Sequence, residues 1–88
     1  MNRRWRGHWE PEAEADLRNM AWLDAAWVVR EVNRLVDDGI GDLRVVVLPR
    51  GARARVLHLP GYRVGVSYDR GTNTVHVWGV WRARIAAP

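Results

Sequence analysis

The sequence predicts a single α+β domain in which a two-helix antiparallel hairpin covers one face of a mainly antiparallel sheet. Two observations predict this class. Apolar residues recur at helical spacing between residues 11 and 38, and from residue 43 onward they alternate with the period of strands. The chain has 88 residues, too few for two separate cores, so we expect one domain over residues 1–88 with the order β-α-α-β-β-β-β.

The first strand is predicted over residues 3–9, where apolar and basic residues alternate. A helix follows, because Pro11 suits the first helical position and the acidic residues after it suit the positive end of the helix dipole. A second helix is expected from residue 22 to residue 38, and Gly39 marks its end. The short connection between the helices predicts an antiparallel hairpin.

Four more strands are predicted in the second half of the chain. Runs rich in β-branched residues are separated there by turn sequences rich in Pro, Gly, Asn and Asp. The expected strands span residues 43–48, 53–59, 62–68 and 74–82. Because the two helices can cover only one face of this sheet, the other face is expected to be open.

The charge is concentrated in the second half. Residues 1–41 contain six Arg and eight Asp or Glu, a net charge of −2, whereas residues 42–88 contain eight Arg and two Asp, a net charge of +6. Such a field favours a polyanion, either nucleic acid or the acidic surface of a partner protein. Cysteine is absent, and no apolar run has the length of a signal sequence or a membrane span. We therefore expect a cytoplasmic protein without a membrane partner.

Strand alternation indicates which side chains share the open face. Between residues 62 and 68 the core set is apolar or aromatic, so Arg63 and Gly65 point to the open face. His58 falls on the same side of the preceding strand. In the last strand the pattern leaves open which alternate set faces the core. If the Arg82 set faces outward, one concave surface carries His58, Arg63, His76, Trp78 and Arg82.

Such a surface suits RNA cleavage by internal transesterification, which needs a proton acceptor and cations but no metal. A guanidinium group can donate two parallel hydrogen bonds to phosphoryl oxygens, a His can transfer the proton, and a Trp can stack on a base. A purely structural role is the alternative for Arg63, Arg82 and His58. The three His residues lack ligand spacing along the chain, and His8 has no evident partner, so no metal or cofactor is expected.

Three stretches carry a resemblance to a known family. They are "HWEPEAEADLRNM", "WVVREVNRLVDDG" and "LHLPGYRVGVSYD" continued by "TVHVWGVWR". In this order they resemble the RelE/ParE superfamily of bacterial type II toxins, in which Gly-Tyr-Arg begins one central strand and an Arg ends the next. The resemblance covers nearly the whole chain.

The resemblance implies a toxin held inactive by an antitoxin with an acidic, helical segment. In the RelE branch the activity is cleavage of mRNA on the ribosome, which would make Arg63, Arg82 and His58 the catalytic residues. The expected RNA-binding residues are Arg53, Arg55, Arg84 and Trp78.

The sequence also departs from the RelE pattern. Val56 stands where a basic residue is usual, no Tyr or His follows Arg82, and regular alternation turns Arg53 and Arg55 toward the side of Leu57. Two alternatives therefore stay open. One is a ParE-like inhibitor of DNA gyrase that has no nuclease chemistry, and the other is a degenerate member that only binds its antitoxin or nucleic acid.

Overall fold

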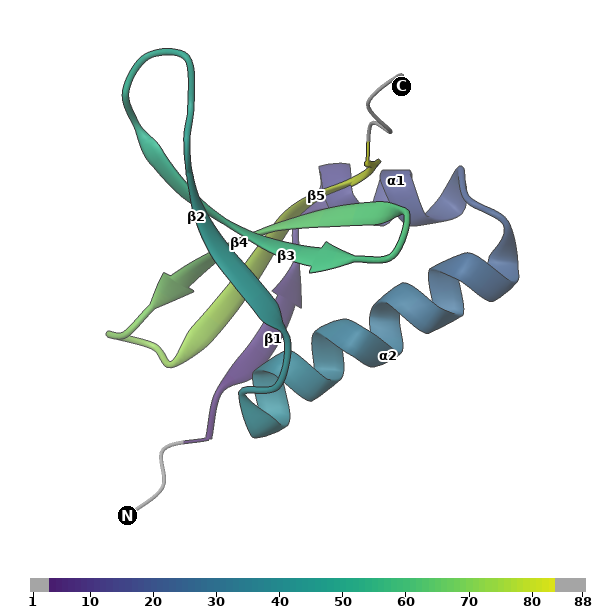
Figure 1. Ribbon diagram of the computed structural model, residues 1–88. Coiled ribbons are helices and arrows are strands. Elements are labelled where there is room, and N and C mark those ends of the chain that lie inside the picture. Colours follow the sequence, from purple (N-terminus) through teal and green to yellow (C-terminus); the bar gives the residue numbers. More distant parts are fainter. Residues whose placement is uncertain (1–3, 84–88) are drawn as a thin grey trace.

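The computed structural model describes residues 4–83. Its elements in chain order are β1 (Arg6–Trp9), α1 (Pro11–Arg18), α2 (Trp22–Asp38), β2 (Asp42–Val47), β3 (Arg53–Leu59), β4 (Tyr62–Asp69) and β5 (Thr74–Arg82). The five strands form one sheet in the order β1-β5-β4-β3-β2 (Figure 1). The predicted α+β class and element order are confirmed.

The start of α1 and the end of α2 each have a local cause. Pro11 occupies the start of α1, and the extended backbone of Glu10 (φ −66°, ψ 154°) leads into it. Gly39 ends α2 in the left-handed conformation (φ 69°). Its N–H donates to the carbonyl of Leu35 at 3.0 Å, which satisfies one of the carbonyls left free at a helix end.

The sheet is antiparallel except at one edge. β1 pairs in parallel with β5, and β2, β3, β4 and β5 pair antiparallel in succession. The chain passes from β1 through both helices to β2 at the opposite edge, and the antiparallel strands then return so that β5 lies beside β1. The β2–β3 hairpin projects away from the helices (Figure 1).

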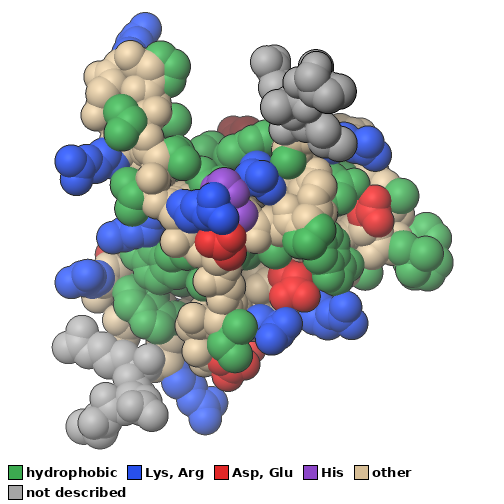
Figure 2. Space-filling model, viewed as in Figure 1, with side chains coloured by type: hydrophobic (Ala, Val, Ile, Leu, Met, Phe, Trp, Pro, Cys, Tyr) green, Lys and Arg blue, Asp and Glu red, His purple; other side chains and the backbone are tan. Residues whose placement is uncertain are grey.

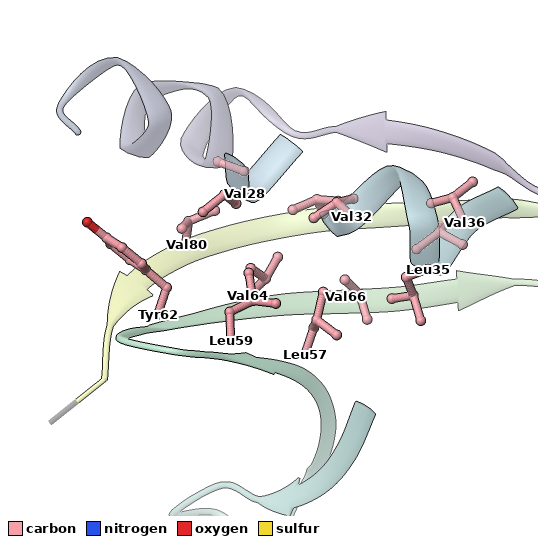
Figure 3. Close-up of a cluster of buried hydrophobic side chains, with 13 residues drawn as sticks. Val28, Val32, Leu35, Val36, Leu57, Leu59, Tyr62, Val64, Val66 and Val80 are labelled. Carbon is pink, nitrogen blue, oxygen red and sulfur yellow. The ribbon is translucent and has the colours of Figure 1, made fainter. Parts of the chain in front are cut away.

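The core lies between the helices and one face of the sheet. Val28, Val32, Leu35 and Val36 of α2 point toward the sheet, and Figure 3 shows them facing valine and leucine side chains of the strands. Burying each such side chain contributes about 1.5–3 kcal/mol. The fully buried strand residues are Leu57, Val64, Val75 and Val77. None of the helices in the described part of the chain has the length and apolarity of a membrane span.

A β-bulge in β5 divides that strand into two parts. Val66 pairs with Val77, but Gly65 pairs with Gly79, so Trp78 is an extra residue on β5. A bulge of this kind shifts the alternation of side chains by one position. The faces predicted by strict alternation therefore hold for only part of β5.

Candidate functional site

The sheet face opposite the helices is called the open face below, and it carries His58, Arg63, Gly65, Ser67 and His76. Strand pairing fixes this set, because residues directly opposite one another on neighbouring strands point to the same side. His58 pairs with Arg63, and Ser67 pairs with His76. On its other side His58 pairs with Asp42 of β2. The predicted positions of His58 and Arg63 on the open face are confirmed.

His58 lies in the centre of a charged group. Its Nε2 is shielded from solvent and has no hydrogen-bond partner among residues 4–83. Burial lowers the pKa of His58, and the positive charges of Arg63 and Arg44 lower it further. The imidazole is therefore neutral at physiological pH. In this state it can accept a proton, but its Nε2 is covered.

Arg63 is held by the turn that precedes it. Its Nη1 donates hydrogen bonds to the carbonyl of Leu59 at 3.0 Å and to that of Tyr62 at 2.8 Å. Gly61 provides the left-handed conformation (φ 80°) of this turn. One nitrogen of the guanidinium thus stabilises the β3–β4 connection, which is the structural role that the sequence left open.

Asp42 and Arg44 complete this group, and sequence reasoning missed both. Arg44 donates from Nε to Asp42 Oδ1 at 3.0 Å and from Nη2 to Asp42 Oδ2 at 2.8 Å. The hydrogen bonds from Arg44 lower the pKa of Asp42, although burial opposes the shift. The sequence feature that could have revealed this pair is the spacing of two between Asp42 and Arg44, which places both side chains on one face of a strand.

Arg82 lies on the face opposite to Arg63, so the predicted shared surface of the two guanidinium groups is wrong. Beyond the bulge, Tyr62 pairs with Arg82, and Arg63 pairs with Trp81. Tyr62 belongs to the core, and the guanidinium carbon of Arg82 lies 6.0 Å from the centre of its ring. The physical reason is the extra residue Trp78, which shifts the alternation of β5 before it reaches residue 82.

Trp78 covers the open face at Gly65. A Cβ atom added to Gly65 would lie 2.3 Å from the Trp78 ring, so only glycine fits beneath the indole. Trp81 stacks on Trp78 with ring centres 5.5 Å apart and planes inclined by 28°. Both indoles are more than one third exposed. The structure therefore places Trp78 on the open face and stacks Trp81 on it, although strict alternation predicts that Trp78 and Trp81 lie on opposite faces.

Three of the predicted RNA-binding residues border one groove, and the fourth lies outside the described residues. Arg53 and Arg55 lie on the side of Leu57, as alternation along β3 requires, and Arg55 lies over the ring of Tyr68 at 5.2 Å. They border a groove of about 680 Å³, whose lining also includes Trp78. Arg84 lies outside the described residues.

The surface around the groove is basic and apolar. Between residues 43 and 68 the sequence contains five Arg and no Asp or Glu, and Figure 2 shows blue basic side chains along the projecting hairpin. Val45 is 60% exposed and Val47 is 70% exposed, and Leu48 lies beside them. Exposed apolar side chains that lie together on a strand surface are typical of a protein contact.

A second polar cluster lies at the parallel edge of the sheet. The pairing of β1 with β5 places His8 opposite His76, and Glu10 Oε1 lies 2.9 Å from His76 Nδ1 and 3.6 Å from His8 Nε2. The expectation that His8 has no partner is therefore wrong. The two histidines are far apart in the sequence, so only the parallel strand pair brings them together.

Comparison with known proteins shows the fold. No protein-family model matches the chain, and no curated protein matches it. A solved chain from the RelBE2 toxin-antitoxin complex of Mycobacterium tuberculosis is similar with a TM-score of 0.76 and 16% sequence identity, over 90% of this chain and 98% of that chain. The fold expected from the RelE/ParE resemblance is thereby confirmed.

Proposed function

We propose that the protein is the toxin of a type II toxin-antitoxin pair and that it inhibits its target by binding, without cleaving RNA. The toxin role is supported by the fold shared with a chain of a toxin-antitoxin complex and by a basic, partly apolar surface suited to an acidic partner. The binding mechanism rests on one observation. Arg63 and Arg82, the two cations proposed to stabilise a phosphate, lie on opposite faces of the sheet.

The chemistry of cleavage explains why this observation decides between the mechanisms. The attacking 2′-oxygen, the phosphorus and the leaving oxygen must be held together, and the cations must converge on the charge that develops there. Arg63 instead donates to two backbone carbonyls, and His58 Nε2 is covered. The ParE branch of the resemblance implies DNA gyrase as the target of a toxin that acts by binding.

An endoribonuclease is the second candidate, and His58 is the observation that favours it. The neutral imidazole pairs with Arg63 and is also close enough to Arg44 for its charge to lower the His58 pKa. Rotation of the covering side chains would give a proton acceptor with two cations beside it. For this activity the ribosome and mRNA would be the partners, Arg44 would take the place proposed for Arg82, and Trp78 would stack on a base.

The groove beside β3 is the proposed docking site of the antitoxin. An extended or helical segment that alternates acidic and apolar residues would place its carboxylates against Arg53 and Arg55. Its apolar side chains would cover Val45 and Val47, which are exposed in the chain by itself. The two contacts would strengthen each other. The bound segment that covers the valines also excludes water from the arginine–carboxylate pairs.

Controlled expression in bacteria tests the proposal. Induction of the chain is expected to stop growth while transcripts remain intact and the supercoiling of a reporter plasmid changes. Transcripts cut within minutes of induction, with cleavage lost in His58→Asn and Arg63→Gln but kept in Arg70→Gln, would replace binding with the nuclease mechanism. Normal growth in cells that contain the soluble, folded chain would overturn the toxin role.

Co-expression of an antitoxin with the expected acidic, helical segment tests the partner. It should restore growth, and Val45→Asp should weaken the complex, because Val45 lines the groove and the change places a carboxylate in the apolar contact. Leu23→Asp is the matched control, since Leu23 is exposed on α2, away from the groove. Equal loss of binding in both variants would argue against the groove as the docking site.

A further inference from the structure

The cluster of His8, Glu10 and His76 takes no part in the proposed toxin function. It forms because β1 and β5 run parallel with His8 opposite His76, so that the two imidazole rings lie 5.4 Å apart. Glu10 follows β1 by one residue and leads into α1, and its carboxylate lies between the two rings. Three ligand atoms from two strand ends therefore converge on one point of the surface.

The spacing of these atoms is close to that of a metal site. Zn²⁺ binds His nitrogen and carboxylate oxygen at about 2.0–2.2 Å, so neighbouring ligand atoms in a tetrahedral site lie about 3.3 Å apart. Here Glu10 Oε1 lies 2.9 Å from His76 Nδ1 and 3.6 Å from His8 Nε2, and all three atoms lie within 4.8 Å of one another. The His8 side chain is 57% exposed, so it can rotate toward the other two at little cost.

The donor types and local charge also favour a divalent transition metal. Two imidazoles and one carboxylate form a donor set that Zn²⁺ binds well and that Mg²⁺, which prefers oxygen and retains its water, does not. The Glu10 carboxylate, within 3.6 Å of both imidazole nitrogens, adds a negative charge that attracts a cation to this point.

We propose that His8 Nε2, Glu10 Oε1 and His76 Nδ1 bind one Zn²⁺ ion, with water or an exchangeable anion as the fourth ligand. The ion joins β1 to β5 and thereby fastens the first strand of the fold to the last. In its absence, a hydrogen bond between Glu10 and His76 connects the same two segments. The metal takes the place of that hydrogen bond, because both atoms that form it become ligands.

Calorimetric titration of the full untagged chain with ZnCl₂ tests the proposal, because a polyhistidine tag would itself bind the metal. One ion per chain is expected, and Zn²⁺ at about 100 times its dissociation constant should raise the melting temperature by about 10–20 °C. MgCl₂ at the same concentration should leave it unchanged. His8→Asn and Glu10→Gln should each weaken Zn²⁺ binding at least tenfold.

His58→Asn is the matched control, since His58 lies on the same face but outside the cluster, and it should bind Zn²⁺ as the parent chain does. Absence of binding in the parent chain would overturn the proposal. So would a His8→Asn chain that binds Zn²⁺ as tightly as His58→Asn, or binding of one ion per two chains with dimerisation. Toxicity is measured separately, so the site and the toxin role can fail independently.

Discussion

The two faces of β4 are built from different kinds of residue. On the covered face, Val64 and Val66 are almost completely buried beneath α2. On the open face, Arg63, Gly65 and Ser67 alternate with them. Removal of apolar surface from water is the main driving force of folding. The covered face therefore supplies stability, and the open face is free to present polar groups to other molecules.

The two faces of β5 are not separated along the whole strand as they are in β4. Its first part follows the alternation of β4, with Val75 and Val77 buried, but Trp78 interrupts the pairing. Beyond that point Arg82 lies on the covered side, near its exposed rim. A single bulge thus decides which side chains a ligand on the open face can reach.

Replacement of Leu57 by Ala should produce the largest effect on stability and so tests the division between the faces. Leu57 is fully buried, and its truncation leaves a cavity, so the free energy of unfolding should fall by about 2–5 kcal/mol. Ser67→Ala is the control on the open face and should change it by less than about 0.5 kcal/mol. Urea denaturation measures both. Equal losses would show that the open face also carries stability.

A Gly65→Ala substitution tests the contact between Gly65 and the bulge residue Trp78. The added methyl group overlaps the indole, and forcing it aside should cost about 1–3 kcal/mol. The cost should be largely removed in a Trp78→Ala background, which a double-mutant cycle by urea denaturation would reveal. Independent, additive effects would mean that Trp78 does not lie over Gly65 in solution. Loss of the Trp78–Trp81 stack should also change the near-ultraviolet circular dichroism.

The smallest expected effect is a pH dependence from His58. Because burial lowers its pKa, the unfolded chain binds more protons than the folded chain near neutral pH. The contribution of neutral His58 to stability is complete above the unfolded pKa of about 6.5 and is lost as the pH falls toward the folded value.

Comparison of the parent chain with His58→Asn isolates the contribution of His58 to the pH dependence of stability. Between about pH 7.5 and pH 5.5 the free energy of unfolding should fall less in His58→Asn than in the parent chain. Urea denaturation at both pH values measures the difference. Equal slopes would mean that His58 is solvated and titrates as it does in the unfolded chain.

Sequence reasoning succeeded where one periodic pattern extended through a whole element. The apolar stripe of α2, the terminal Gly39 and the alternation of β4 each indicated the observed structure, because each depends only on residues near in the chain. The same holds for the faces of His58 and Arg63. Their environment was less accessible to prediction, since the carbonyls that hold Arg63 depend on the conformation of the β3–β4 turn.

By itself, the sequence determined the class of fold, the strand order along the chain and the basic character of its second half, because hydrophobic period and charge are properties of the residues in order. Tertiary structure alone decided which distant groups meet. The parallel pairing of β1 with β5 brings His8 to His76, and the bulge at Trp78 turns Arg82 away from Arg63. Both depend on the register between strands, which packing of the whole domain sets and which no local pattern encodes.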